Sequence, residues 1–264
     1  MPNLAVIGYP VGHSRSPTMQ TAALTEMKLA GEWTYGALEV APEDFEAEVA
    51  ELAAAGEYAG VNVTVPHKEA ALAMADAASE AARAIGAANT LSFRDGQIAA
   101  DNTDAGGLLR SLPHLPEGAN ALVLGAGGAA RAAIWGLADA GATVDVWNRT
   151  EQRGESVARE LGARFVADPD PADYSLIVNT TAVGLGGEDP FEHLPLSADS
   201  FNAEQVVVDM VYGDEPSPLL TAAAAAGATT VDGLEMLVQQ GALSLQIWTG
   251  EEPSLEAMRA AVRL

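Results

Sequence analysis

The chain has 264 residues, 48% of them hydrophobic, so it is long enough for two domains of ordinary size, each with a buried core. It has no cysteine, which excludes disulfides and thiolate metal sites, and its four histidines lack ligand spacing, so we predict no metal. With 37 acidic against 13 basic residues, the formal net charge of −24 would repel nucleic acids and anionic membranes, and we expect neither as a partner.

The sequence predicts a cytoplasmic protein. The first ten residues lack a basic region, their apolar run 4–7 is too short for a signal peptide, and no apolar stretch approaches the roughly 20 residues of a membrane span. A solvated acidic surface is the ordinary explanation of the charge. Its size also suggests adaptation to high salt, because at 1 M salt the Debye length falls to about 3 Å and self-repulsion is screened.

The first part of the chain alternates between strand and helix patterns, which is typical of an α/β domain. Pro66 would begin a helix, because its missing N–H costs nothing in a first turn. In chain order we expect a strand at 4–8, a helix at 17–29, a strand at 34–40, a helix at 42–54, a strand at 60–65, the helix from Pro66, and paired strands at 88–93 and 97–100 with a turn at 94–96.

The alternation starts again from Asn120, and polar residues at 101–104, just before a helix, mark the expected domain boundary. The repeat of strand and helix favours a parallel sheet. The expected elements are strands at 121–124 and 143–148, helices at 128–140 and 151–161, strands near Phe165, Leu176 and Val206, a long helix from Gly233 to about Trp248 and a last helix from Pro253. Periodicity alone leaves open on which domain the last two helices pack.

A glycine-rich loop stands between the strand 121–124 and the helix that follows. Its residues fit the dinucleotide-binding pattern G-x-G-x-x-A in the strand-to-helix context that gives the pattern meaning. The first glycine permits a tight turn, the second lets the backbone approach a pyrophosphate, and the helix N-terminus offers unpaired N–H groups. The loop comprises Gly125, Ala126, Gly127, Gly128, Ala129 and Ala130. A tight turn without a ligand is the alternative interpretation.

The end of the next strand indicates which dinucleotide is bound. NAD sites place an acidic residue there for the ribose 2′-OH, whereas this strand ends in Asn148, Arg149 and Thr150. The Arg149 guanidinium offers a planar fork to a 2′-phosphate, with the other two as hydrogen-bonding companions. The sequence therefore predicts NADP as the cofactor, although Arg149 could also be a solvated residue at a helix start.

Lys68 is one of only two lysines in the chain and a candidate catalytic residue. Reduction of a ketone requires a proton at the carbonyl oxygen, which a lysine can supply. Lys68 follows a strand end in the run 62–68, and Asp104 at the domain boundary could pair with it. On composition alone, an ordinary surface lysine is the simpler interpretation.

Several short motifs together resemble the shikimate dehydrogenase family over nearly the whole chain, in the family's order and spacing. They are Gly8, Pro10, His13, Ser14, Ser16 and Pro17, then the runs 62–68, 85–90 and 102–104, the glycine loop, 148–150, 209–212 and 236–240. The resemblance implies reversible NADPH-dependent reduction of 3-dehydroshikimate to shikimate, a step toward chorismate and the aromatic amino acids.

The resemblance also implies roles for individual residues. Ser14 and Ser16 would hold the substrate carboxylate, and Lys68 with Asp104 would be the catalytic pair. The remaining implied residues are Thr64, Asn89 and Asp104 for ring hydroxyls, Tyr212 and Gln240 to complete the pocket, and Thr180 and Gly233 at the nicotinamide end of the cofactor.

The implied fold is α/β: an N-terminal substrate domain with a mixed sheet, residues 1–103, and a Rossmann-like NADP-binding domain, residues 104–235. The C-terminal helices, 236–264, would pack back on the first domain. The chain departs from the family at Gln20 and Thr21, where His and Asn are usual and packing behind the carboxylate site could change, and at Glu235, where glycine is common.

Two alternatives stay open from the sequence. One is an NAD-preferring quinate/shikimate dehydrogenase, and the other is a non-catalytic protein that binds NADP or a ligand on the same scaffold. The expected partner is a small molecule, and the expected assembly is a monomer or a homodimer.

Overall fold

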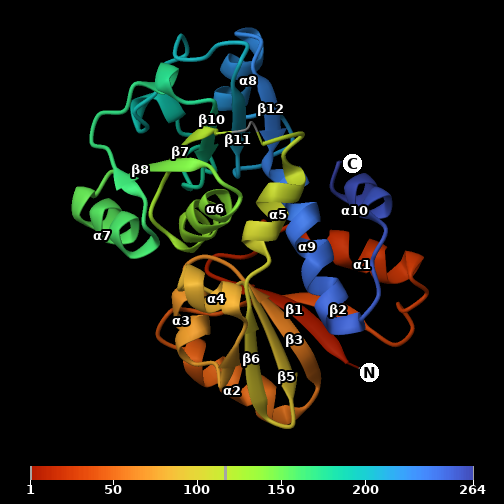
Figure 1. Cartoon of the computed structure of the whole chain (residues 1–264). Helices are drawn as coiled ribbons and strands as arrows, with labels where there is room; N and C mark the ends of the chain where they lie inside the picture. Colours follow the sequence, from red (N-terminus) through yellow and green to blue (C-terminus); the bar gives the residue numbers. More distant parts are fainter. Residues whose placement is uncertain (1, 116–117, 264) are drawn as a thin grey trace. The chain divides into compact units, whose positions relative to one another are not determined.

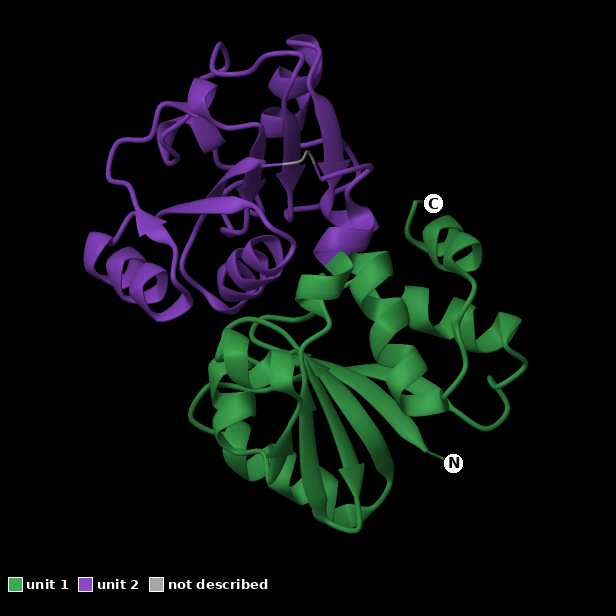
Figure 2. Ribbon diagram, viewed as in Figure 1, with its two compact units in different colours: residues 1–107, 237–264 green, residues 108–236 purple. Residues whose placement is uncertain are grey.

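A computed structural model describes residues 2–115 and 118–263. The chain forms two compact units (Figure 2): unit 1 contains residues 1–107 and 237–264, and unit 2 contains residues 108–236. Each unit has its own sheet and its own buried hydrophobic clusters. The domain limits expected above stay predictions.

Unit 1 has a mixed six-stranded sheet in the order β2-β1-β3-β5-β6-β4, as the family resemblance implied. β1 pairs in parallel with β2 and β3, whereas β5 is antiparallel to both β3 and β6. The strands are β1 (Asn3–Gly8), β2 (Thr34–Glu39), β3 (Tyr58–Val63), β4 (Ala77–Ala78), β5 (Thr90–Arg94) and β6 (Gln97–Asp101).

The sheet of unit 1 carries helices on both faces (Figure 1). On one face, Ala5, Ile7 and Val61 pack with Phe45 and Val49 of α2 in one buried cluster, and on the other α9 lies against β3 and β5. The helices are α1 (Ser16–Glu26), α2 (Phe45–Ala55), α3 (Lys68–Ala73), α4 (Glu80–Ile85), the start of α5 (Asp104–Ser111), most of α9 (Gly233–Thr249), and α10 (Leu255–Val262). The C-terminal helices therefore belong with the first unit.

Unit 2 has a parallel six-stranded sheet in the order β12-β11-β10-β7-β8-β9. The chain steps outward from β7 in one direction and then from β10 in the other, which is the doubly wound order of dinucleotide-binding domains. The elements are β7 (Asn120–Leu124), α6 (Gly128–Asp139), β8 (Thr143–Trp147), α7 (Glu151–Leu161), β9 (Arg164–Phe165), β10 (Leu176–Asn179), β11 (Val206–Asp209), α8 (Pro218–Ala225) and β12 (Thr229–Asp232).

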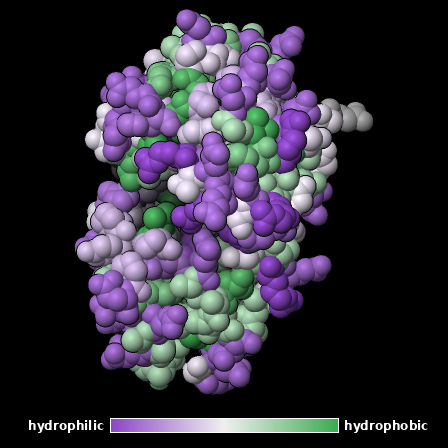
Figure 3. All heavy atoms as spheres, turned by 90° about the vertical axis from the view of Figure 1, so that its left-hand side faces the viewer, coloured by the Kyte–Doolittle hydropathy of each residue, from purple (hydrophilic) through white to green (hydrophobic). Residues whose placement is uncertain are grey.

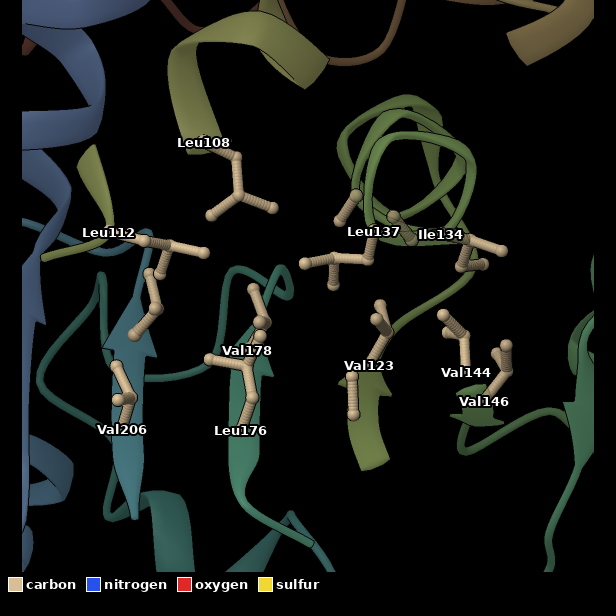
Figure 4. Close-up of a cluster of buried hydrophobic side chains, with 14 of the residues drawn as sticks. Leu108, Leu112, Val123, Ile134, Leu137, Val144, Val146, Leu176, Val178 and Val206 are labelled. Atoms are coloured by element: carbon tan, nitrogen blue, oxygen red, sulfur yellow. The ribbon is translucent and has the colours of Figure 1, made fainter. Parts of the chain in front are cut away.

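Alternating residues of the unit 2 strands enter two separate cores, because successive side chains point to opposite faces of a sheet. Val123, Val178 and Val206 lie in a cluster with Ile134 and Leu137 of α6 (Figure 4). Leu122, Ile177 and Val207 lie in a second cluster, with Leu219 and Leu220 of α8. Both faces of the sheet are thus covered, as a parallel sheet requires.

The structure corrects the predicted helix start at Pro66. Residues 64–67 form a turn in which His67 N–H donates to the Thr64 carbonyl, and Tyr9 N–H donates to the Val65 carbonyl at 3.0 Å. The chain therefore stays bound to the end of β1 through Val65, and α3 begins only at Lys68. Smaller differences are that α1 ends at Glu26 and α2 begins at Phe45.

Hydrophilic residues cover much of the face that Figure 3 draws, with hydrophobic ones between them. No helix in the described part of the chain is long and apolar enough to cross a membrane. Within the same residues, no cluster of three or more His, Cys, Asp and Glu side chains could hold a metal ion.

Candidate active site

Four chain segments of unit 1 meet at one end of its strands. β1 ends at Gly8 and β3 at Val63, and the register pairs Ile7 with Val63. Because β5 is antiparallel to β3, it begins at this same end of the sheet with Thr90, which pairs with Asp101, the last residue of β6. The residues that follow or precede these positions, including Lys68, Asn89 and Asp104, are brought together for this reason.

Lys68 and Asp104 form an ion pair beside these strand ends. The Nζ–Oδ2 distance is 2.5 Å, and the side chains are 12% and 5% exposed. Asp104 opens α5, and its N–H donates to Oδ1 of Asn102, while Asn102 Nδ2 donates to the Ala87 carbonyl. The position of the carboxylate is thus fixed by backbone as well as by side-chain contacts.

Asn89 is the hub of the site. Its Nδ2 donates to Asp104 Oδ1 and to Thr103 Oγ1, both at 2.9 Å, and lies 3.2 Å from Gln240 Oε1. Its Oδ1 accepts from the Thr103 backbone N–H at 2.8 Å, which fixes the orientation of the amide. Both Asp104 oxygens therefore accept hydrogen bonds, one from Lys68 and one from Asn89, as an ionised carboxylate does.

A buried polar layer supports Asn89 from behind. Asn62 Nδ2 donates to the Asn89 carbonyl and to Thr90 Oγ1, and the Tyr35 hydroxyl donates to Asn62 Oδ1 at 2.7 Å. Burial raises the pKa of Tyr35 well above its usual range, so the phenol stays protonated and remains a donor. The Ser244 hydroxyl of α9 lies 3.5 Å from Asn62 Oδ1, which links this layer to α9.

His67, directly before Lys68, anchors the start of α3. Its ring stacks on Phe45 with centroids 4.4 Å apart, and Nε2 lies 2.8 Å from the Val40 carbonyl. Desolvation by burial lowers the pKa of His67, against a smaller opposing effect of the Val40 hydrogen bond. A neutral, stacked ring thus fixes the backbone from which the Lys68 side chain extends.

The other residues expected in the substrate site lie in unit 1, apart from Tyr212. Ser14 Oγ accepts from the Ser16 N–H at 3.2 Å, so the two serines are adjacent at the start of α1. Thr64 lies against Gly8, where a Cβ would come within 2.4 Å of the threonine methyl. Tyr212 belongs to unit 2, in the segment after β11, and its substrate role stays a prediction.

The glycine loop of unit 2 follows β7 as expected. Gly125 has φ of +120°, and a Cβ there would lie 2.5 Å from Thr180 Oγ1, so only glycine fits without strain. Gly127 caps α6 without a side-chain hydrogen bond, and a Cβ there would meet nothing within 4 Å. The loop thus leaves open space in front of unpaired helix N–H groups, which fits a pyrophosphate.

A cavity of about 460 Å³ lies at the end of β8 in unit 2. Arg149 lines it with Asn148, and Asn148 Nδ2 donates to the Thr150 carbonyl at 2.8 Å, which orders the turn before α7. The opposite wall comes from residues after β10, namely Thr181, Ala182, Val183, Glu188, His193 and Leu194. Sequence reasoning did not identify this second wall, because no motif marks it.

Arg153 is a further basic residue that the sequence analysis missed. It lies four residues after Arg149, in the first turn of α7, and its Nε donates to the carbonyl of Ala126 in the glycine loop at 3.2 Å. The signal that could have found it is a second basic residue at the start of the helix that follows Arg149.

The two remaining cofactor-site candidates have structural contacts in unit 2. Thr180 Oγ1 donates to the Leu124 carbonyl at 2.7 Å, and a Cβ on Gly233 would lie 2.4 Å from the Met210 carbonyl. Nearby, buried Asp209 accepts from Asn179, Ser217 and the Val211 N–H. Burial raises the pKa of Asp209, against the opposing effect of these three donors.

The chain was compared with known proteins. Residues 6–91 match the model of the shikimate dehydrogenase substrate binding domain, and residues 233–263 match that of the shikimate 5′-dehydrogenase C-terminal domain. The chain is 42% identical over 277 residues to a shikimate dehydrogenase (NADP⁺) of Geobacter metallireducens, covering 98% of this chain and 95% of that protein. It is 43% identical over 265 residues to one of Halobacterium salinarum, covering 98% and 97%.

Among solved structures, the shikimate 5-dehydrogenase of Thermus thermophilus in complex with NADP(H) and shikimate is 42% identical, with a TM-score of 0.91. The alignment covers 100% of this chain and 99% of that one. The similarity extends over both units, and the chain therefore belongs to the shikimate dehydrogenase family.

Proposed function

We propose that this protein catalyses the reversible reduction of 3-dehydroshikimate to shikimate with NADPH. The observation that carries the proposal is the nearly buried Lys68–Asp104 ion pair, which lies at the strand ends of unit 1 together with Asn89. This pair, the glycine loop and the arginine after β8 are the groups that the reaction would use.

Lys68 would handle the proton. Its ammonium has three N–H groups, and Asp104 Oδ2 accepts one of them. The other N–H groups could donate to a substrate oxygen. During reduction the ammonium would donate a proton to the ketone oxygen, and in the reverse direction the amine would take it from the hydroxyl. Asp104, held by Asn89, would keep the ammonium in place through both steps.

The hydroxyls of Ser14 and Ser16 would bind the substrate carboxylate as neutral donors. Ser14 Oγ already accepts the Ser16 N–H, which leaves its own O–H free to point outward. Thr64, Asn89 and Asp104 would bind the ring hydroxyls, and Tyr212 and Gln240 would complete the pocket. A pocket made of hydrogen-bonding side chains would reject analogues that lack a hydroxyl, because buried polar groups would be left unpaired.

NADP is the cofactor that fits unit 2. When bound, its nicotinamide supplies or accepts the hydride. Gly125 and Gly127 to Ala129 would take the pyrophosphate at the N-terminus of α6, and Arg149, with Asn148 and Thr150, would bind the 2′-phosphate. We add Arg153 to this set on the basis of its contact with the glycine loop. Thr180 and Gly233 would lie at the nicotinamide end.

The test is to follow NADPH absorbance with 3-dehydroshikimate as substrate, and the reverse reaction with shikimate and NADP⁺. Parallel assays with NAD⁺ and with quinate would establish the preferences for cofactor and substrate. We expect turnover with NADP(H) and shikimate to be preferred. Binding of both ligands without turnover would instead favour the non-catalytic alternative.

The compartment and the assembly complete the proposal. We expect the protein to act in the cytoplasm on small molecules, as a monomer or homodimer. Fractionation of cells and light scattering of the purified protein would test the two expectations separately.

A further inference from the structure

Gln20 is a fully buried polar residue that the proposed mechanism does not use. It lies on α1 with 0% exposure, and its Nε2 donates to the Gly241 carbonyl of α9 at 2.9 Å, joining positions 221 residues apart. Its other amide atom, Oε1, is buried and has no hydrogen-bond partner within the described residues.

The amide of Gln20 is not explained by stability. A buried acceptor without a partner is costly, and an apolar side chain of the same size would avoid that cost. Replacing the amide would also leave the Gly241 carbonyl with the Ser244 Oγ hydrogen bond at 3.0 Å. What the amide supplies and an apolar side chain would not is a hydrogen bond from α1 to the backbone of α9.

That contact falls next to a substrate-site residue. Gly241 follows Gln240, and a Cβ on Gly241 would lie 2.3 Å from Met19 Cε and 3.1 Å from Gln20 Nε2, so α1 and α9 approach closely at this point (Figure 1). From the α5 side, a Cβ on Gly107 would lie 2.6 Å from Gln240 Cβ. The backbone of Gln240 is therefore held between α1 and α5.

Gln240 in turn contacts Asn89. Its Oε1 lies 3.2 Å from Asn89 Nδ2, which also donates to Asp104. A small shift of α9 would change where the Gln240 amide lies relative to Asn89. We infer that Gln20 is a positioning residue, which sets the place of Gln240, and through it substrate binding, by holding the Gly241 carbonyl.

This inference rests on the proposed function, and Gln20→Met tests it. Methionine fills a similar volume without the donor and without the unpartnered oxygen. We expect the KM for shikimate to rise on the order of 10-fold, below the ~100-fold that a misplacement of 1 Å can cost. The KM for NADP⁺ should stay unchanged, and the thermal midpoint should not fall. Thr25→Val, at an exposed position on the same helix, is the matched control.

A double variant separates positioning from a merely structural role. If Gln20 acts through Gln240, the Gln20→Met/Gln240→Ala protein should have the same KM for shikimate as Gln240→Ala alone. Multiplying effects, or a lowered thermal midpoint with an unchanged KM, would overturn the inference. Gln20→Asn, which keeps the polarity but shortens the reach, replaces Gln20→Met if that variant does not fold, and the same rise in KM is expected.

The wild-type assay keeps the two hypotheses apart. An inactive wild-type protein would overturn the proposed function and this inference with it. An active wild-type protein whose Gln20 variants bind shikimate equally well would overturn the inference alone.

Discussion

Lys68 and Asp104 are 36 residues apart in the sequence, and their side chains meet at 2.5 Å in a nearly buried ion pair. Lys68→Ala should lower kcat by about 10²- to 10⁴-fold, the usual contribution of general acid–base catalysis, with a modest change in KM. Steady-state kinetics with shikimate and NADP⁺ measures both. Lys28→Ala, at an exposed site, is the control and should leave kcat unchanged. Turnover that survives in Lys68→Ala would exclude this residue as the proton carrier.

Gly125 and Gly127 of the glycine loop should respond differently to substitution by alanine. Gly125→Ala places a Cβ against Thr180 at φ of +120° and should cost about 1–3 kcal/mol of unfolding free energy. Gly127→Ala meets no atom of the protein within 4 Å and should fold normally, but its Cβ would occupy the path of the pyrophosphate and weaken NADP binding. Thermal unfolding and fluorescence titration of NADPH distinguish the two. A Gly127→Ala protein that binds NADPH normally would contradict the assigned loop.

Arg149→Ala should weaken NADP⁺ binding and leave NAD⁺ binding nearly unchanged, because only NADP⁺ carries the 2′-phosphate. We expect a rise in the KM for NADP⁺ of roughly 10- to 100-fold, the equivalent of about 1.5–3 kcal/mol for a charged hydrogen bond. Arg159→Ala, at an exposed position in the last turn of the same helix, controls for the loss of a positive charge. An unchanged preference for NADP⁺ in Arg149→Ala would refute the assignment.

Asp145 should make stability depend on pH. Burial alone would raise the pKa of this carboxyl, but hydrogen bonds from Arg164 and Tyr174 outweigh it, so the pKa in the folded state is lowered. The stabilisation is therefore present above the unfolded pKa of about 3.9 and is lost as the pH falls through the folded value.

Tyr174→Phe removes the donor that lies 2.8 Å from Asp145 Oδ2. We expect acid unfolding, followed by circular dichroism, to begin at a higher pH in this variant than in the wild type. The wild-type protein supplies the reference curve. A destabilisation of equal size at every pH would show that the hydrogen bond does not influence the titration of Asp145.

The net charge of −24 should make fold and activity depend on salt. Repulsion between acidic groups is screened at about 1 M salt, where the Debye length is ~3 Å, and acts over some ~30 Å at 0.01 M. Dialysis into low salt should lower activity and the thermal midpoint together, and return to high salt should restore both. Full stability in low salt would exclude adaptation to high salt.

Local patterns predicted much of the fold. The helix at 151–161 and the strand–loop–helix around Gly125 have clear periodicity and turn residues, and the structure confirms them. Short elements were missed: α4 has six residues and depends on the Ser79 cap, and β4 has only two residues, paired with β6. Such segments owe their structure to the surrounding chain more than to their own sequence.

The site was predictable where strand ends converge and less so where distant helices contribute. The resemblance named both Asn89 and Gln240, but nothing in their spacing indicates that they touch across 151 residues. The contact between Gln20 and Gly241 depends on the packing of α1 against α9, which no pattern in either helix reveals.

The scarcity of lysine makes the proposed catalytic amine, that of Lys68, observable on its own. Lys28 is exposed with φ of +61°, whereas the Lys68 side chain is 12% exposed and bound to Asp104. Reductive methylation with isotope-labelled formaldehyde would give the side chains only two dimethylamine resonances in an NMR spectrum, one from Lys28 and one from Lys68. Ligand binding near a single labelled amine could then be followed without substituting any residue of the chain.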